Sequence, residues 1–180
     1  MPLLVIGTMV DGKVNWLLAG HSGIIGHDKV MVSLVKTHYT NKGIKDTKTL
    51  SINIVDESML KKADYVGSVS GSKVDKSEVF EYHIGEAGAP IIDNAPVVME
   101  CKVEDNYETE TFDNFIMSIS NTYVQEENLD EKGKIDYTKF SPVLFEFPKY
   151  TYLRTGDTIG NCLRLDLSLI HISEPTRHAQ

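Results

Sequence analysis

Several short stretches bring together residue types that bind charged or aromatic ligands. In Val32–Asn41 an apolar segment ends and gives way at once to polar groups, namely Lys36, Thr37, Tyr39 and Thr40. Ammonium and hydroxyl groups bind phosphate, and an aromatic ring packs against a flavin or adenine ring. On spacing alone, a polar turn between a strand and a helix remains the better explanation.

A second stretch, Gly67–Lys73, reads GSVSGSK and suggests a phosphate-binding loop. The spacing between its glycines is one residue short, and Val74 occupies the place of the hydroxyl that binds magnesium. The P-loop interpretation therefore fails. Two interpretations of this stretch remain. It is a plain surface loop, or a nest of backbone N–H groups that holds an anion, with Lys73 and Lys76 nearby.

Metal and nucleophile chemistry find no support in the sequence. Ser22 and Ser70 do not match the G-x-S-x-G pattern of a nucleophile elbow. No metal-ligand spacing connects four of the histidines, which are His21, His27, His38 and His83. We expect no metal ion and no catalytic side chain.

The elements that position these residues are mostly short strands. Apolar, β-branched runs predict strands over Leu3–Thr8, Val30–Val35, Leu50–Val55 and Val97–Val103. Asp11-Gly12 predicts a tight hairpin, because both turn positions favour positive φ. No alternation of strands with helices appears, which favours an antiparallel barrel or sandwich.

The rest of the chain adds few helices. Thr40–Asp46 is expected to be a short helix capped by Thr40, and Glu57–Val66 a helix capped by Asp56. Phe115–Ser120 alternates as a half-buried strand does. The later segments are expected to be an acidic surface excursion with a turn at Lys132-Gly133 and two short strands, over Glu126–Lys134, Phe145–Phe147 and Tyr150–Thr155.

Bulk properties exclude several classes of protein. The 180 residues fit one domain, and the net charge of −8 comes without a basic cluster, so we expect no nucleic-acid partner. No stretch reaches the ~18 apolar residues of a membrane helix. Cys101 and Cys162 are far apart in apolar surroundings, which predicts reduced structural thiols and a cytoplasmic location.

The C-terminal segment Leu167–Arg177 is similar, residue for residue, to a translated sequencing-library adapter. We interpret residues 167–180 as a non-native tail and leave them out of the reasoning on fold and function. On this interpretation the native domain covers residues 1–166 and is truncated at its C-terminal end.

Taken together and in order, a set of segments resembles the flavin-reductase-like family of FMN-binding split barrels, the flavoredoxin type. No one segment is diagnostic, but the ordered set is specific and extends from Leu3 to Cys162. The segments are Val5–Thr8 with Asp11–Gly20, Val32–Ile44, Ser51–Ile54, Ala63–Gly71 with Val74–Ser77, and Leu153–Cys162.

The resemblance implies a mainly β fold, a six-stranded antiparallel split β-barrel of Greek-key type with a few short helices. It implies a homodimer that binds FMN near the dimer interface. The residues expected to contact FMN are Asn15, Leu17, Leu18, Ala19, Gly20 and Ser22 beside the ring, Ser33, Lys36, Tyr39 and Thr40 on the phosphate and ribityl chain, Asn53 in the wall, and Ser70, Gly71 and Lys76 as its closure.

The implied function is an NAD(P)H:flavin oxidoreductase, in which the flavin takes hydride and passes electrons to free flavin, an iron centre or a redox protein. Two alternatives stay open: a non-catalytic FMN electron carrier for protein partners, and a barrel that has lost flavin and binds another small ligand. The second follows from departures from the family pattern. Leu18 replaces a threonine, His21 an aromatic residue and Val35 an arginine, so two cofactor donors are missing.

Overall fold

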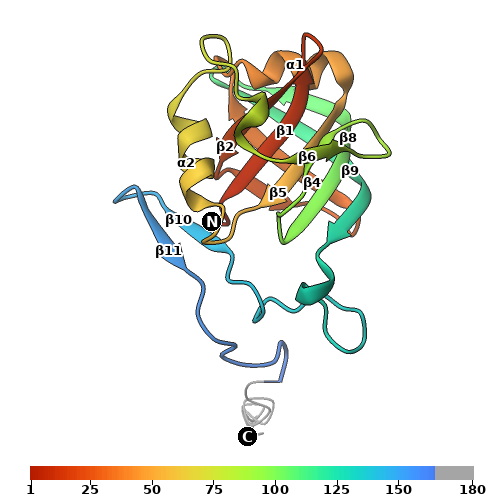
Figure 1. Ribbon diagram of the computed structural model, residues 1–180, viewed down its shortest axis with the longest axis vertical. Helices are drawn as coiled ribbons and strands as arrows, with labels where there is room; N and C mark the ends of the chain where they lie inside the picture. The colour runs from red at the N-terminus through yellow and green to blue at the C-terminus, as the bar shows by residue number, and fades with distance from the viewer. Residues whose placement is uncertain (165–180) are drawn as a thin grey trace, which may run out of the picture.

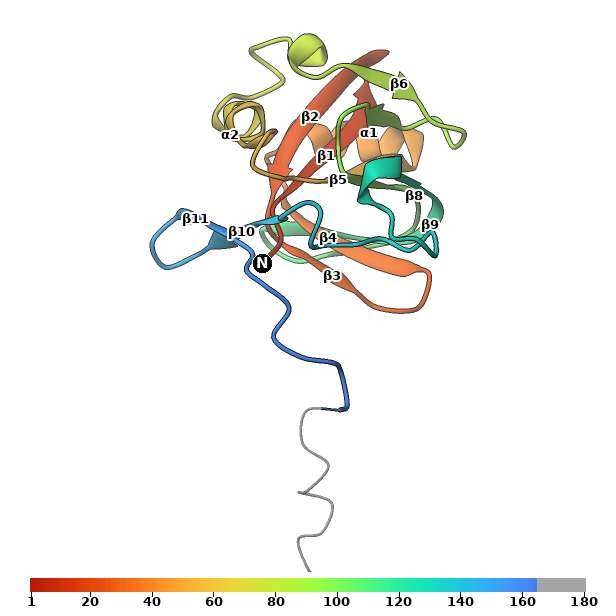
Figure 2. The same ribbon diagram turned by 60° about the horizontal axis from the view of Figure 1, so that its bottom comes forward.

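The protein is described here by a computed structural model, which covers residues 1–164. Seven strands form one antiparallel sheet in the order β2-β1-β5-β8-β9-β4-β3, and the sheet is curled into an open barrel (Figures 1 and 2). The strands are β1 Leu4–Val10, β2 Lys13–Ala19, β3 Ser22–Ile24, β4 Lys29–Val35, β5 Thr49–Ile54, β8 Val97–Glu108 and β9 Phe112–Val124. The predicted split barrel is confirmed, and the short β3 is a seventh strand beside the six expected.

The barrel is split because its two edge strands do not pair with each other. These edges, β2 and β3, follow one another in the chain and are joined only by Gly20 and His21. The inner face carries one apolar cluster, which includes Ile6, Val32 and Phe115. The outer face of β1 and β2 carries a second cluster around Trp16, so both faces of these strands are buried.

The hairpin between β1 and β2 is formed as predicted. Asp11 and Gly12 both have positive φ, of 51° and 79°, which matches the twist of the two strands. On β1, Gly7 lies under the ring of Trp16, and a Cβ at this position would be 2.3 Å from the ring atom Cζ3. Glycine at position 7 therefore lets the indole pack directly on the sheet.

Two helices cover parts of the barrel (Figure 1). Helix α1, Thr40–Thr47, packs on β1, but Thr40 does not cap it, because its hydroxyl bonds to a distant asparagine of β2. The predicted cap was therefore wrong. Helix α2, Leu60–Ser68, begins later and ends later than expected, and Asp56 does accept a hydrogen bond from the N–H of Met59.

A small hairpin of β6, Tyr82–Ile84, and β7, Pro90–Ile92, lies over the outer face and is held by a buried carboxylate. Glu100 accepts hydrogen bonds from the N–H groups of Ala87 and Ala89 in the hairpin turn, at 2.9 and 3.1 Å. It also accepts bonds from Asn121 and Tyr123 on β9. Four donors thus compensate the burial of this charge.

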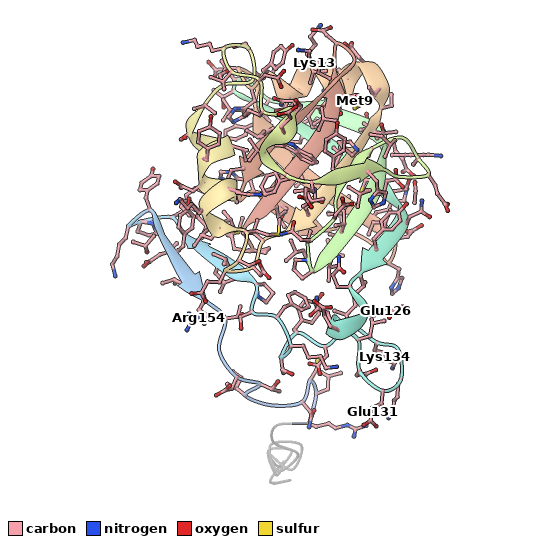
Figure 3. All side chains as sticks on the ribbon, in the orientation of Figure 1. Met9, Lys13, Glu126, Glu131, Lys134 and Arg154 are labelled. Carbon is pink, nitrogen blue, oxygen red and sulfur yellow. The ribbon has the colours of Figure 1, made fainter. Side chains whose placement is uncertain are left out.

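The chain after β9 leaves the barrel at one end. It contains the 3-10 turn Glu126–Asn128 and the ribbon of β10, Val143–Glu146, with β11, Thr151–Arg154. In the acidic excursion the side chains of Glu126, Glu127 and Glu131 are exposed as predicted, Asn128 is buried, and Gly133 has a φ of 71° in the turn. Figure 3 shows the excursion at the opposite end of the molecule from Lys13. An apolar hollow of about 670 Å³ opens at this end, and Pro2 and Thr155 are both in its wall.

The two cysteines differ in their surroundings. Cys101 is buried as expected, but Cys162 is exposed, so its predicted apolar surroundings were wrong. Among residues 1–164 no helix is long and apolar enough to cross a membrane. The adapter-like segment, residues 167–180, lies outside the described residues.

Candidate functional site

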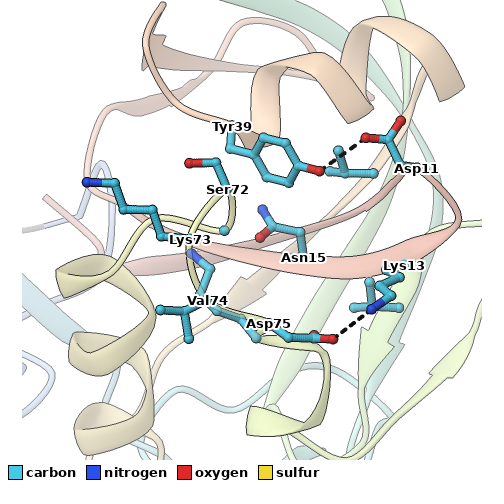
Figure 4. A pocket seen from close by; sticks show the side chains of 12 residues that line it. Asp11, Lys13, Asn15, Tyr39, Ser72, Lys73, Val74 and Asp75 are labelled. Carbon is cyan, nitrogen blue, oxygen red and sulfur yellow. Dashed lines mark hydrogen bonds and ion pairs between the residues drawn. The ribbon is translucent and has the colours of Figure 1, made fainter.

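A polar groove lies between the β1–β2 hairpin, the start of α1 and the loop that follows α2 (Figure 4). It consists of two hollows that share Tyr39, Gly71 and Lys76 in their walls. The helix hollow, about 250 Å³, lies against Thr37–Thr40 at the start of α1. The hairpin hollow, about 390 Å³, lies against Lys13 and the loop around Asp75.

The two hollows meet at a buried hydrogen bond between segments far apart in the sequence. The Nδ2 atom of Asn15 donates to the Oγ1 atom of Thr40 at 2.7 Å. The backbone of Gly71 runs against this pair, and a Cβ on Gly71 would be 2.0 Å from the Oδ1 atom of Asn15. Only glycine lets the loop after α2 approach so closely.

The groove contains a buried ammonium group. Lys76 is 3% exposed, and its Nζ atom donates to the carbonyl oxygens of Val66 at 2.9 Å and Val69 at 3.1 Å. Within the described part of the chain, no carboxylate forms an ion pair with it. Burial lowers the pKa of Lys76 to about 8. The charge is thus held by the helix C-terminus alone, and an anionic ligand would stabilise it further.

His38 lies beside this ammonium in the wall of the helix hollow. Burial, and then the charge of Lys76, lower the pKa of His38. The imidazole is therefore neutral at pH 7, because its ordinary pKa already lies near 6.5. The helix hollow thus offers a neutral ring and hydroxyl groups around one positive charge.

Seven of the predicted cofactor residues lie in the walls of this groove. They are Asn15, Leu17, Tyr39, Thr40, Ser70, Gly71 and Lys76. They come from β2, the start of α1 and the loop after α2, so the fold brings together segments that the sequence separates widely.

Two of the predicted phosphate ligands lie elsewhere. Side chains alternate along β4, and Ser33 is on the face opposite the buried Val32. The Oγ atom of Ser33 donates to the Oδ1 atom of Asn114 at 2.6 Å, and Lys36 forms an ion pair with Glu108 at 3.1 Å. Neither residue is in the wall of either hollow.

The other predicted residues also lie outside the two hollows. Leu18 packs against Gly67 of α2, Gly20 lies near Phe145, and Ser22 is in the wall of the 670 Å³ hollow. Ala19 belongs to the inner apolar cluster. Leu18, which stands where the family pattern has threonine, therefore packs against α2 and is not in the wall of either hollow.

Asn53 is completely buried, and its amide is fully used in holding strands together. Its Nδ2 atom donates to the carbonyl of Val5 at 2.9 Å and to the Oγ atom of Ser51 at 2.8 Å. Its Oδ1 atom accepts from the N–H of Ile92 at 3.1 Å. The structure therefore gives Asn53 a role in joining β1, β5 and β7.

Several residues of the groove were not among the predicted contacts of FMN. Thr37 and His38 line the helix hollow, and Lys13 and Asp75 line the hairpin hollow. Lys13 follows the Asp11-Gly12 turn directly, so its place at the end of the hairpin was the signal that could have identified it. Lys73, considered as part of an anion nest, also lines the hairpin hollow.

Comparison with known proteins decides the family. The family model described as the flavin reductase like domain matches residues 1–154. The chain belongs to this family. Among curated proteins no significant match is found.

Solved structures agree with this flavin-reductase-like assignment. The chain is similar to the flavoredoxin of Methanosarcina acetivorans, with 36% identity, a TM-score of 0.91, and coverage of 94% of this chain and 92% of that one. It is also similar to the flavoredoxin of Desulfovibrio vulgaris (Miyazaki F), with 29% identity, a TM-score of 0.85 and 91% coverage of both chains. An FMN-binding protein of Thermus thermophilus, 22% identical with a TM-score of 0.78 and 89% coverage of both chains, shares the fold.

The groove fits the polar part of the cofactor that this flavin-reductase-like family binds. A phosphate and a ribityl chain need a positive charge and several hydroxyl partners. Lys76 offers the charge, and Tyr39, Thr40 and Ser70 bring hydroxyl groups to the same walls. Because Gly71 has no side chain, the loop after α2 packs directly against Asn15 in the wall of the groove.

Proposed function

We propose that the chain is an FMN-dependent oxidoreductase that accepts hydride from NADH or NADPH and passes electrons to a separate acceptor. The observation that carries this proposal is the buried ammonium of Lys76, a residue in the wall of a groove with hydroxyl-bearing side chains, which forms no ion pair with a carboxylate in the described chain. Membership of the flavin-reductase-like family supports it.

The chain's own residues bind and orient the cofactor. FMN, when bound, supplies the chemistry of hydride acceptance and electron release. Lys76 balances its negative charge, and Asn15 holds the hydroxyl of Thr40 in place through the 2.7 Å bond. Tyr39, half-buried between the two hollows, forms the aromatic wall. No acid or base side chain is required for this chemistry.

A binding titration tests the proposal. FMN fluorescence is followed as the purified chain is added, for the wild type and for Lys76→Met. We expect the variant to bind FMN at least tenfold more weakly, because a charge-assisted contact contributes roughly 1.5–3 kcal/mol. Lys102→Met is the matched control, since Lys102 is exposed on β8, outside both hollows. Equal FMN affinity of the wild type and Lys76→Met would refute the assignment of the groove.

Adding NADH or NADPH to the FMN-loaded chain then tests the activity. Bleaching of the flavin bands supports an NAD(P)H-dependent reductase. The similarity to two flavoredoxins favours a second candidate, a non-catalytic FMN electron carrier. Flavin that is retained, does not bleach with either nucleotide and is reduced by dithionite would favour this carrier.

We also propose that the chain acts as a homodimer in the cytoplasm. Apolar side chains are exposed around the open end of the barrel, with Ile24 at 68%, Ile25 at 49% and Tyr137 at 55%. Such a patch is typical of an interaction surface. Sedimentation should give twice the chain mass of 20.1 kDa, and Ile24→Lys should shift the mass toward the monomer. The cytoplasm would keep Cys101 and Cys162 reduced.

A further inference from the structure

The hairpin hollow carries positive charge that the proposed flavin site does not use. Apart from Lys76, which the proposed function gives to the flavin, its wall carries the ammonium groups of Lys13 and Lys73 and the carboxylates of Asp11 and Asp75. Lys42, which is not in this wall, forms an ion pair with Asp11, and the hydroxyl of Tyr39 donates to the same carboxylate. With Lys42 counted, three ammonium groups stand against two carboxylates, which leaves a surplus of one positive charge without Lys76. This local surplus is notable because the whole chain has a net charge of −8.

One of these lysines is free to reach a ligand, and another is only loosely held. Lys73 is exposed and forms no ion pair within the described part of the chain. Lys13 is 74% exposed at its side chain and pairs with Asp75 at 3.1 Å. In Figure 4 the two lysines lie on opposite sides of Asn15. Their long, flexible side chains can therefore approach a ligand in the hollow from two sides.

Asp75 does not depend on Lys13 for its own stabilisation. The Oδ1 atom of Asp75 accepts hydrogen bonds from the N–H of Ser77 at 3.0 Å and from its Oγ atom at 2.7 Å. These bonds, with Lys13 after them, lower the pKa of Asp75 to about 2. Lys13 can thus leave Asp75 for a more highly charged partner, because exposed ion pairs contribute little.

We propose that the hairpin hollow binds the 2′-phosphate of NADPH and thereby makes the chain selective for NADPH over NADH. The two nucleotides differ only by this phosphate monoester, so selectivity requires a contact that NADH lacks. The hollow, about 390 Å³, adjoins the helix hollow that the proposed function gives to the flavin, and it falls within the usual size of ligand sites. The inference rests on that proposed function.

Two probes without a nicotinamide ring test the phosphate contact separately from electron transfer. Calorimetry at low salt measures the binding of 2′,5′-ADP and of 5′-AMP to the purified chain. We expect 2′,5′-ADP to bind at least tenfold more tightly, and the difference to shrink as salt is added. Lys73→Ala and Lys13→Gln should each reduce the difference at least threefold, and Lys102→Ala should leave it unchanged.

Asp75→Asn gives a test in the opposite direction. The asparagine keeps an oxygen that accepts from Ser77 but no longer competes for Lys13. We therefore expect 2′,5′-ADP to bind more tightly to this variant than to the wild type. A loss of affinity would contradict the role given to Lys13.

Kinetics of the FMN-loaded chain separate the two proposals. The ratio of kcat/KM for NADPH to that for NADH should fall in Lys73→Ala, while kcat with NADH stays constant. Equal affinity of the wild type for both probes, with reduction of the flavin by both nucleotides, overturns the inference and leaves the proposed function intact. If neither nucleotide reduces the flavin, the reductase proposal fails instead. If Lys73→Ala removes the preference for FMN over riboflavin, the hollow belongs to the flavin phosphate and the inference is wrong.

Discussion

Replacing Gly71 by alanine adds one carbon atom where the loop after α2 packs against Asn15, and thereby tests the geometry of the groove. The new Cβ would lie 2.0 Å from the Oδ1 atom of Asn15 and 2.9 Å from the Cδ1 atom of Tyr39. Asn15 is buried and bonded to Thr40, so it cannot move without losing that bond. Either Asn15 shifts, or the loop after α2 moves outward and widens the groove.

Both responses have a cost that can be estimated. Overpacking of this kind destabilises a protein by about 1–3 kcal/mol, and loss of the Asn15–Thr40 bond costs about 0.5–1.5 kcal/mol. If about 1.4 kcal/mol of this cost is lost from the free energy of FMN binding, the affinity for FMN falls tenfold. We therefore expect Gly71→Ala to bind FMN at least tenfold more weakly and to unfold at lower urea concentration.

The assays are a fluorescence titration of FMN and a urea unfolding curve. Gly23→Ala is the matched control, because a Cβ on Gly23 meets no atom within 4 Å. This control should keep the affinity of the wild type and gain up to about 1 kcal/mol in stability. Wild-type affinity in Gly71→Ala would refute the view that this close approach shapes the FMN site.

Three further predictions concern buried titratable groups. Burial raises the pKa of Glu100, but four hydrogen bonds outweigh it and leave the pKa lowered, so its stabilisation is present above about pH 4.5 and is lost at lower pH. Glu100→Gln should lower the free energy of unfolding at pH 7 by about 1.5–3 kcal/mol and remove this acid dependence, as urea unfolding at several pH values would reveal. Because the pKa of Lys76 falls from 10.5 to about 8 on folding, the unfolded chain holds the extra proton between these values. The free energy of unfolding of the wild type, relative to that of Lys76→Met, should therefore rise by about 3 kcal/mol between pH 8 and 10.5. A constant difference between the two proteins over this pH range would contradict the prediction. Burial, and then the charge of Glu100, raise the pKa of the Cys101 thiol to about 12, so a thiol reagent should modify Cys162 alone in the native chain and both cysteines in urea.

The sequence predicted best those features that depend on neighbouring residues. Asp11-Gly12 determines its turn through its own φ preferences, and the alternation along Phe115–Ser120 identifies the face that packs inward, with Phe115 and Met117 in the inner cluster. The role of Thr40 was missed, because its hydroxyl bonds to Asn15, 25 residues away. Local patterns contain no information about such a partner.

The candidate site shows the same limit. The family pattern placed Lys76 near the cofactor, but its burial depends on the carbonyl groups at the end of α2. Ser33 and Lys36 have the right chemistry for phosphate. The pairing of β4 with β9 places Ser33 opposite Asn114, and Lys36, just after β4, forms its ion pair with Glu108 at the end of β8. Residue type predicts the kind of contact, and the register of the strands decides which partner is reached.

The gap between β2 and β3 also has a consequence for protein engineering. Cutting the chain at Gly20–His21 would break no ladder of the sheet, because these two edge strands do not pair. Pro2 and Thr155 line the same hollow, so a short linker could join these two positions. We therefore expect a circular permutant that begins at His21 and ends at Gly20 to retain every strand pair, with its new termini beside the opening of the barrel.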